Sequence, residues 1–347
     1  MFIRNHWYVA AFAEQLGPAP LARTICGEAI LLYRKSDGGA VAMHDGCPHR
    51  LVPLSIGMVE GDNIRCKYHG MVFSPTGRCL QAPGKGASLA LTVERIYETA
   101  ERYGMIWVWI GDAAADPAKL PDLPWLESPG WAQTRESFSI ACDHRFVIDN
   151  LMDLTHEAYV HPETIGQTEL MEAPVAARRE ADAAILERFM PDIDPPPYWA
   201  QMLGKPGRVD RWQVCRFTLP STVLIDSGVA PVGSGGFGGD RAQGVTGQVI
   251  NLITPSTEQS CYYFLIQARD FALDADAAMQ ARFNAAMRRV VQQDIEVLEA
   301  QQAYINAHPA ARLRALNIDA GATYARLMMQ RATGVKADST FAGPVES

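Results

Sequence analysis

The sequence of 347 residues lacks the features that define three large classes of protein. No stretch approaches the roughly 18 consecutive apolar residues of a membrane-spanning helix, so we expect no membrane association. The N-terminus has neither the apolar block nor the small-residue cleavage site of a secretory signal peptide, which makes the cytoplasm the expected location. Asp and Glu (39) outnumber Lys and Arg (31), and no basic run offsets the net charge of −8. A nucleic-acid-binding surface is therefore not expected.

Cysteine is also scarce, and the seven cysteines are an odd number scattered along the chain. A disulfide framework is improbable in a cytosolic chain of this length, so clustered cysteines are better tested as metal ligands. Only two of them have a histidine at ligand spacing. We expect the other five to be buried apolar side chains: Cys26, Cys79, Cys142, Cys215 and Cys261.

The composition is 48% hydrophobic and 20% charged, so the chain has enough apolar residues to form hydrophobic cores. The length suggests about two domains. A connector of small residues and prolines follows residue 110, and we place the domain boundary there. The expected division is a first domain at 1–115, a second at 125–335 and a polar tail at 336–347.

The first domain is predicted to be rich in β-strand, and the second to mix strand and helix. Runs of Val, Ile, Tyr and Trp between Gly, Pro and Asp turns predict the strands of the first domain. In the second domain, the glycine-rich run 233–239 indicates a mobile loop, with a lid over a pocket as the alternative. The predicted elements are strands at 28–33, 39–43, 71–73, 105–110, 211–230 and 244–268, and helices at 143–162 and 275–308.

Two short segments near the N-terminus each carry one cysteine and one histidine. Cys47 and His49 lie in the first segment, and Cys66 and His69 follow in the second. Two thiolates and two imidazoles can hold a tetrahedral zinc ion or a [2Fe–2S] cluster with two Cys on one iron and two His on the other. Because each segment mixes the two residue types, whereas zinc fingers pair like with like, the spacing favours the cluster.

A second group of candidate ligands lies in the predicted helix at 143–162. Asn150, Asp153 and His156 are spaced three apart and follow one helical face, so Asp153 can contact the ring of His156. His161 lies five residues after His156, about 140° away on a regular helix, which is poor geometry for sharing one ion. We therefore predict a π-like widening of the helix here.

The third ligand should be a carboxylate, and the predicted helix at 275–308 offers Asp294. This residue falls in the middle of an apolar stripe, where a carboxylate is costly unless it is paired or bound to a metal. Two histidines and one carboxylate form the facial triad of non-haem Fe(II) oxygenases. The stripe consists of Phe283, Met287, Val290, Val291, Val297 and Leu298.

If the substrate carries a carboxylate, the protein must supply a cation or hydrogen-bond donors for it. Four polar residues on the predicted sheet are candidates, although strand alternation turns about half of such positions outward. We hypothesise that the first of them anchors the carboxylate: Arg216, Asn251, Tyr263 and Gln267.

Together with several other segments, these residues resemble those of a known protein family, and the resemblance covers nearly the whole chain. The sequence resembles the Rieske non-haem iron oxygenases, and within them the oxygenase components of vanillate O-demethylases, with dicamba and toluenesulfonate methyl monooxygenases more distant. The most specific stretch is Asn150-Leu151-Met152-Asp153-Leu154-Thr155-His156. The resemblance also rests on residues 5–10, 210–213, 253–255 and 316–321.

The resemblance implies an α+β fold, with a β-rich Rieske domain followed by a helix-grip domain whose antiparallel sheet wraps a long C-terminal helix. It implies that Asp153 links an iron-binding histidine to a Rieske histidine of a neighbouring subunit, in a head-to-tail homotrimer. Asn150 would lie near the iron without being a firm ligand. The implied ligands are Cys47, His49, Cys66 and His69 for the [2Fe–2S] cluster, and His156, His161 and Asp294 for the Fe(II).

The implied reaction is O-demethylation of a methoxybenzoate such as vanillate, to protocatechuate and formaldehyde, with O₂ as oxidant. No Gly-x-Gly-x-x-Gly motif follows a strand, so no bound NAD or flavin is expected, and an NADH-dependent flavin and [2Fe–2S] reductase is required. Other methoxybenzoates, a dicamba-like substrate, or hydroxylation of the methyl group of a toluenesulfonate-like substrate are alternatives. A Rieske electron carrier and a zinc-stabilised binding module are the alternatives from other classes.

Overall fold

The computed structural model describes residues 1–84 and 89–334, and its contacts divide the chain into two compact units. The first unit contains Phe2–Pro121 together with Thr254–Glu258, and the second contains Asp122–Ile253 and the chain from Gln259 onward. The division between Pro121 and Asp122 falls within the connector between the two expected domains. The assignment of 254–258 to the first unit has no signal in the sequence. The expected polar tail at 336–347 lies outside the described residues.

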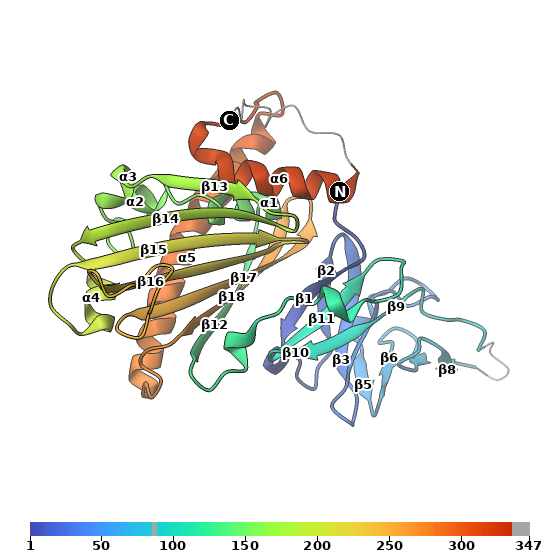
Figure 1. Cartoon of the computed structure of the whole chain (residues 1–347). Helices are drawn as coiled ribbons and strands as arrows, with labels where there is room; N and C mark the ends of the chain where they lie inside the picture. The colour runs from blue at the N-terminus through green and yellow to red at the C-terminus, as the bar shows by residue number, and fades with distance from the viewer. Residues whose placement is uncertain (85–88, 335–347) are drawn as a thin grey trace. The chain divides into compact units, whose positions relative to one another are not determined.

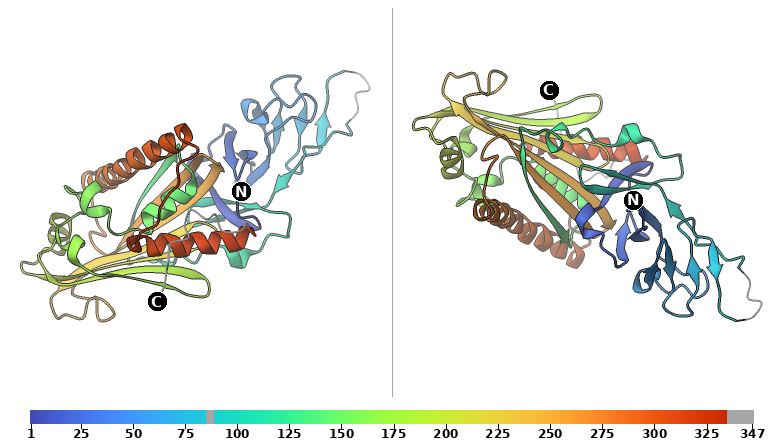
Figure 2. Two further views of the ribbon diagram at one scale, coloured as in Figure 1. Left: turned by 90° about the horizontal axis from the view of Figure 1, so that it is seen from above. Right: turned by 90° about the horizontal axis from the view of Figure 1, so that it is seen from below.

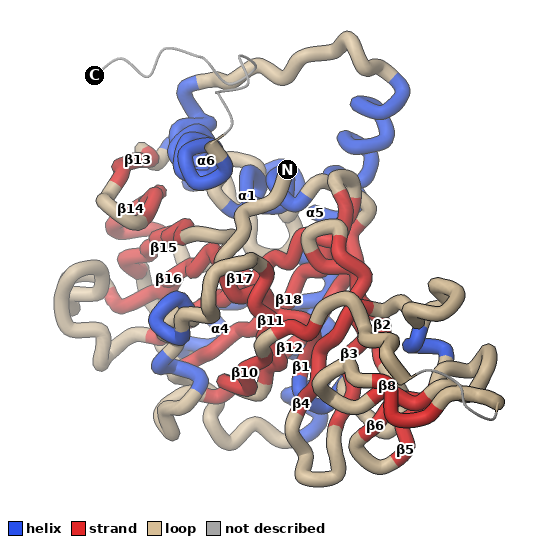
Figure 3. The backbone as a smooth tube through the Cα atoms, turned by 90° about the vertical axis from the view of Figure 1, so that its right-hand side faces the viewer, coloured by secondary structure: helices blue, strands red, loops and turns tan. Residues whose placement is uncertain are grey.

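The first unit is built from short strands in three sheets, joined by loops (Figure 3). Its sheets have the orders β1-β11-β10, β2-β3-β4-β9 and β5-β6-β7-β8. All six residues of β11 are buried, in keeping with its uninterrupted apolar sequence. The strands are β1 (His6–Phe12), β2 (Leu21–Ile25), β3 (Glu28–Arg34), β4 (Ala40–His44), β5 (Met58–Glu60), β6 (Asn63–Arg65), β7 (Val72–Phe73), β8 (Cys79–Gln81), β9 (Ile96–Tyr97), β10 (Thr99–Arg102) and β11 (Met105–Ile110).

The loops of the first unit that matter for chemistry follow β4 and β6. Residues 45–53 leave the end of β4, and residues 66–71 connect β6 to β7. The core beneath them is apolar and includes Leu31, Tyr33, Met43 and Phe73. Short 3₁₀ helices lie at Ala13–Gln15, Leu54–Ile56 and Pro117–Lys119 in this unit, and at Pro124–Leu126 and Asn317–Asp319 in the other.

The second unit is organised around a seven-stranded antiparallel sheet with the order β12-β18-β17-β16-β15-β14-β13 (Figure 1). Alternate residues of its long strands face a helix-covered side, and the expected α+β class is confirmed. The strands are β12 (Ala132–Ile140), β13 (Val175–Arg179), β14 (Ala183–Ile193), β15 (Val209–Thr218), β16 (Thr222–Pro231), β17 (Val245–Thr257) and β18 (Ser260–Arg269).

The long helix α5 (Ala277–Ala307) crosses one face of this sheet, as Figures 1 and 2 show. The expected helix at 275–308 is therefore confirmed. The prediction of a buried apolar stripe on this helix is also largely confirmed, because Phe283, Met287, Val291 and Leu298 are buried. Val290 is half-buried, and Val297 departs from the prediction, since half of its surface (50%) is exposed.

The expected continuous helix at 143–162 is wrong, because the chain breaks into α1 (His144–Leu151) and α2 (Glu157–Val160). The predicted π-like widening is also wrong. The amide of His161 donates to the carbonyl of Glu157, four residues back, at 3.1 Å, as in a regular helix. The bend before α2, rather than a widened turn, brings the two histidines to one site.

Helix α6 (Ala320–Thr333) supports the segment that carries these histidines. Its arginine Arg326 donates from Nε to Asp149 of α1 at 2.8 Å, and Gly321 packs against the loop after α1. A Cβ at Gly321 would lie 2.7 Å from the carbonyl oxygen of Met152, so only glycine permits this approach. The remaining helices are α3 (Glu169–Glu172) and α4 (Pro197–Leu203).

The glycine-rich run 233–239 lies in the loop between β16 and β17, as predicted. Phe237 of this loop stacks on Phe189, with ring centroids 5.4 Å apart. None of the residues 233–239 lines the cavity described below, so the lid interpretation has no structural basis. None of the described helices is long and apolar enough to cross a membrane.

Candidate active site and metal centres

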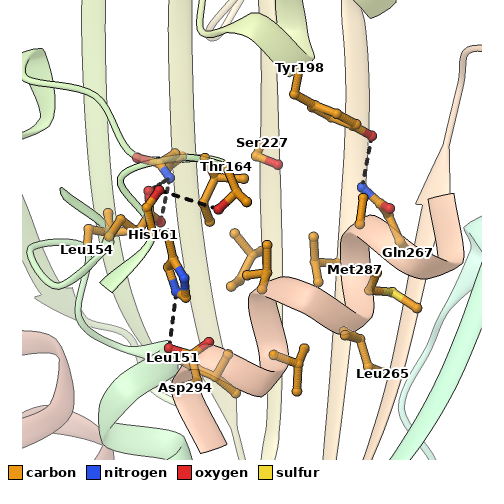
Figure 4. A pocket seen from close by; sticks show the side chains of 18 of the residues that line it. Leu151, Leu154, His161, Thr164, Tyr198, Ser227, Leu265, Gln267, Met287 and Asp294 are labelled. Atoms are coloured by element: carbon orange, nitrogen blue, oxygen red, sulfur yellow. Dashed lines mark hydrogen bonds and ion pairs between the residues drawn. The ribbon is translucent and has the colours of Figure 1, made fainter. Parts of the chain in front are cut away.

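Two histidines and one aspartate converge between α2 and α5. His156 precedes α2 and His161 follows it, while Asp294 lies in the middle of α5. Figure 4 shows the ring of His161 directed toward Asp294. The Nε2 atoms of His161 and His156 lie 3.1 Å and 3.5 Å from Oδ1 of Asp294. One ligand atom from each residue lies within 4.8 Å of the others. This arrangement matches the two-histidine, one-carboxylate set that binds iron with open positions.

The outer nitrogens of both rings face protein groups rather than the shared site. Nδ1 of His161 lies 2.9 Å from Oε1 of Gln293, and an acceptor there fixes the proton on Nδ1. Nδ1 of His156 lies 3.6 Å from the carboxylate of Asp153, which confirms the expected contact between these residues. Both Nε2 atoms are consequently available to a cation, so the residues fit a mononuclear metal.

The electrostatics of the triad also favour a cation. Burial alone would lower the pKa of His156, but its interactions with Asp153 and Asp294 outweigh burial and raise that pKa. Burial would raise the pKa of Asp153, yet the hydrogen bonds from His156 and Thr155 lower it. The site thus stabilises positive charge at the position that a metal would occupy.

Asn150 lies at the end of α1 and donates from Nδ2 to Oδ1 of Asp294 at 3.1 Å. This contact places Asn150 beside the triad, where an amide can hold the orientation of the carboxylate. The neighbouring Asp149 pairs with Arg326 and ties α1 to α6.

A cavity of about 420 Å³ opens from the triad between the sheet and α5, a size typical of small-molecule sites. Its walls are mostly apolar, which suits a flat aromatic ring. They include Ile225, Val249, Leu265, Met287, Val290 and Val291.

Three of the four candidate substrate-binding residues line this cavity. Asn251 is fully buried, donates to the carbonyls of Val223 and Val249, and accepts from the Tyr263 hydroxyl at 2.6 Å. Its polar atoms are thereby used within the protein. Gln267 donates from Nε2 to the Tyr198 hydroxyl oxygen at 3.3 Å and faces the cavity.

The prediction that Arg216 faces the pocket is wrong. Its guanidinium pairs with Glu180 at 2.7 Å and with Asp182 at 3.2 Å, and its side chain is 36% exposed. The cause is strand alternation in β15, where Gln213 faces the cavity and Arg216, an odd number of positions further, faces outward.

Sequence reasoning missed a buried polar network behind α2. The carboxylate of Glu157 accepts two hydrogen bonds from Nε2 of Gln213, at 2.7 and 2.8 Å, and lies 3.7 Å from Nη2 of Arg211. Arg211 also donates to Oε1 of Gln167 at 2.6 Å, and its burial lowers its pKa. The two-residue spacing of Arg211 and Gln213 within a strand was the available signal. The sequence contains no comparable signal for Tyr198, which lies on α4.

The four candidate cluster ligands lie on two loops of the first unit with the same hydrogen-bond pattern. The amide of Cys47 donates to the carbonyl five residues on, and its carbonyl accepts from Leu51, four residues on. Cys66 repeats both bonds, its carbonyl accepting from Gly70. Leu51 (φ 58°) and Gly70 (φ 67°) both adopt the left-handed conformation that this turn needs.

The loops turn their thiols inward and their imidazoles outward. Cys47 and Cys66 are 2% and 1% exposed, while the rings of His49 and His69 lie closer to the surface with centroids 4.6 Å apart. Burial, together with the adjacent Cys66 thiol, raises the pKa of Cys47. Two thiols beside two imidazoles form a donor set that fits a [2Fe–2S] cluster with mixed ligation. The remaining five cysteines are buried, as expected.

Comparison with known proteins decides the family. Residues 140–333 match the vanillate O-demethylase oxygenase C-terminal domain, and residues 6–96 match the Rieske [2Fe–2S] domain. The chain belongs to the vanillate O-demethylase oxygenase family. It is therefore an oxidoreductase of the Rieske oxygenase type that carries a [2Fe–2S] cluster and a mononuclear iron, and it works with a separate reductase on an aromatic substrate. The electron-carrier and zinc-module alternatives are thereby rejected.

Individual relatives agree with this family assignment over most of the chain. The vanillate O-demethylase oxygenase subunit of Pseudomonas sp. (strain HR199 / DSM 7063) is 41% identical over 95% of both chains. That of Pseudomonas sp. (strain ATCC 19151) is 44% identical over 88% of this chain and 94% of the relative. The crystal structure of dicamba monooxygenase bound to dicamba superposes with a TM-score of 0.86, at 31% identity, over 96% of this chain and 98% of that one.

Proposed function

We propose that this protein is the terminal oxygenase of a two-component system that converts vanillate to protocatechuate and formaldehyde. The observation that carries the proposal is the triad of His156, His161 and Asp294 at one end of an apolar cavity. The family members at 41% and 44% identity, which are vanillate O-demethylase oxygenases, support the choice of substrate.

We assign the metal ligands from the two clusters of donor residues. Cys47, His49, Cys66 and His69 hold the [2Fe–2S] cluster, while His156, His161 and Asp294 hold the iron. When bound, the iron supplies O₂ activation beside the substrate and the cluster supplies electrons. The assignment is supported by the matching loops around Cys47 and Cys66 and by the convergence of both histidine Nε2 atoms on Oδ1 of Asp294.

The chain's own residues bind, shield and orient the reactants. Val249, Leu265 and Met287 line the cavity, where they would pack against an aromatic ring and exclude water from its methoxy group. Asn150 holds the Asp294 carboxylate, and Gln293 holds the His161 ring, so the ligand atoms keep their direction during the reaction.

The reaction balances when one atom of O₂ enters a C–H bond of the methoxy group and the other leaves as water. The two electrons come from NADH through the reductase, and two protons complete the water. The resulting hemiacetal loses formaldehyde and leaves the phenol oxygen on the ring, which gives protocatechuate from vanillate.

We further propose a homotrimer that receives electrons from a flavin and [2Fe–2S] reductase. Large apolar side chains are exposed around the two cluster loops, which suits a protein interface. Asp153 remains our candidate for a link from His156 to a Rieske histidine of a neighbouring subunit. Dependence on NADH supports a cytoplasmic location. The exposed side chains are Leu51 (77%), Tyr68 (61%), Met58 (56%) and Ile56 (54%).

Activity on several aromatic acids tests the substrate. We expect vanillate, with NADH and a flavin–ferredoxin reductase under air, to give protocatechuate and formaldehyde with a higher kcat/KM than dicamba or toluene-4-sulfonate. A higher kcat/KM for either of the other substrates, or NADH consumption without formaldehyde, would contradict the proposal.

A pair of cysteine variants tests the cluster ligands. Cys47→Ser should lose the visible absorption and acid-labile sulfide of the cluster. Cys79→Ser is the matched control, because Cys79 is equally buried in the same apolar core but has no histidine at ligand spacing, and its thiol donates to the carbonyl of Gln81 at 3.4 Å. A cluster retained in Cys47→Ser would overturn the assignment.

A further inference from the structure

The cavity has a second polar end, across the apolar walls from the triad. Figure 4 shows Tyr198 and Gln267 on the side of the cavity away from His161 and Asp294. Tyr198 is carried by α4 and Gln267 by β18, so two separate elements bring these groups together. An aromatic ring with its methoxy group at the triad would direct a distal substituent toward this pair.

The Tyr198 hydroxyl is held as a hydrogen-bond donor. Burial raises the pKa of Tyr198 to about 12, so the hydroxyl keeps its proton at neutral pH. Its oxygen already accepts a hydrogen bond from Nε2 of Gln267 at 3.3 Å. Within residues 1–84 and 89–334, no acceptor takes the Tyr198 proton, which leaves it for a ligand in the cavity.

A buried cation, the guanidinium of Arg269, acts on Tyr198 of this pair. Arg269 is fully buried, and its guanidinium donates to the neutral oxygens of Thr134 and Gln280, both at 3.0 Å. It also lies over the ring of Phe283 at 4.0 Å. In the part of the chain that the structure describes, the partners of the Arg269 guanidinium are these neutral groups, and no carboxylate pairs with it within 4 Å. The positive charge of Arg269 reaches Tyr198, where it acts to lower the hydroxyl pKa.

Arg211 is buried and lines the cavity, but it is a weaker candidate for binding an anion. Arg211 lies 3.7 Å from the carboxylate of Glu157, which offsets its charge. Its Nη1 is bonded to Gln167 at 2.6 Å. An incoming carboxylate would also meet the negative Glu157 at this wall, whereas the Tyr198 end offers donors and an unopposed positive charge.

We propose that Tyr198 and Gln267, in the field of Arg269, form the subsite that binds the carboxylate of the aromatic acid. This inference rests on the proposed function and adds the residues that select an acid over a neutral aromatic compound. Tyr198 donates its hydroxyl proton to one carboxylate oxygen, and the second amide hydrogen of Gln267 is available to the other. The ring then spans the apolar middle of the cavity.

A matched pair of tyrosine variants tests the subsite by equilibrium binding. Vanillate and vanillyl alcohol, which lacks the carboxylate, are titrated into the metal-loaded protein without O₂. Tyr198→Phe should weaken vanillate binding about tenfold or more, with little change for the alcohol, because a hydrogen bond to a charged group is lost. Tyr263→Phe is the control, since the Tyr263 hydroxyl is committed to Asn251 at 2.6 Å. It should leave the ratio of the two affinities unchanged.

A second variant keeps the test decisive if Tyr198→Phe folds poorly. Gln267→Glu has nearly the same shape but adds a negative charge, so it should abolish the preference for vanillate over the alcohol. Equal affinity of the wild-type protein for both ligands, or an unchanged preference in both variants, would overturn the subsite. A wild-type protein that binds and demethylates no methoxybenzoate would instead refute the proposed function.

Discussion

Nε2 of His161 lies 3.1 Å from Oδ1 of Asp294, which joins the end of α2 to the middle of α5 across 133 positions of sequence. The contact exists because the apolar stripe of α5 is buried in the core of the unit to which both helices belong. A carboxylate in that stripe must find a partner or a metal. Removing either residue should therefore affect metal binding before it affects the fold.

Asp294→Ala should lower iron content from about three to about two atoms per chain, because the mononuclear iron is lost and the [2Fe–2S] cluster is kept. Iron analysis and acid-labile sulfide on the same sample measure both centres. Glu296→Ala, an exposed carboxylate two residues further along α5, should keep all the iron. Loss of sulfide in Asp294→Ala would show that the variant disturbs more than the triad.

Gln293→Ala should weaken binding of Fe(II) about 10- to 100-fold, because the acceptor that orients the His161 ring is removed. Titration of the metal-free protein with Fe(II) under anaerobic conditions measures the dissociation constant. Gln292→Ala is the control at the adjacent, exposed position. Equal constants for the two variants would mean that Gln293 has no role in positioning.

Glu157→Ala should lower the free energy of unfolding by about 3 kcal/mol, because it leaves the buried Arg211 without a nearby carboxylate. Glu163→Ala breaks an ion pair with Arg289 whose side chains are 73% and 58% exposed, and should cost at most about 1 kcal/mol. Denaturant unfolding of both variants measures the difference. A similar cost for the two glutamates would contradict the role of the buried network.

Asp143 should make stability depend on pH in the acid range. Burial alone would raise its pKa, but hydrogen bonds with His144 and Arg145 outweigh burial and hold the pKa well below the ordinary value of 3.8. The stabilisation by the Asp143 carboxylate is therefore complete above the unfolded pKa and is lost as the pH falls, since only the unfolded state takes up the proton.

The comparison of wild type with Asp143→Asn measures this effect. The stability difference should be constant from pH 7 to pH 5 and should shrink by about 1 kcal/mol between pH 5 and pH 3. Unfolding free energies at each pH provide the values. A difference that stays constant down to pH 3 would show that the Asp143 pKa is not depressed in the folded protein.

The features that could be predicted from the sequence are those that depend on the spacing of residues along the chain and on the chemistry of their side chains. The apolar stripe around Asp294 predicted both the helix and a carboxylate facing the core, since a period near 3.6 residues is visible without tertiary information. The pairs Cys47 with His49 and Cys66 with His69 were visible for a similar reason, because each lies within one short loop.

The features that sequence reasoning missed depend on tertiary contacts. The bend before α2 lies where Gly321 of α6 approaches the carbonyl of Met152, a contact that the sequence does not reveal. The pattern of His156 and His161 therefore suggested a widened helix, which does not form. The outward direction of Arg216 depends on the register of β15, which the residue type does not reveal. Tyr198 reaches the cavity only because α4 folds beside Gln267, which is 69 positions away in the sequence.

A single-turnover experiment tests the central claim most directly. The protein is loaded with iron and its cluster, reduced chemically, freed of reductant, and mixed with vanillate and O₂ without reductase or NADH. One electron from each metal centre suffices for one demethylation. We predict protocatechuate and formaldehyde in equal amounts, approaching one per catalytic site. Oxidation of the reduced protein with vanillate recovered unchanged would contradict the account.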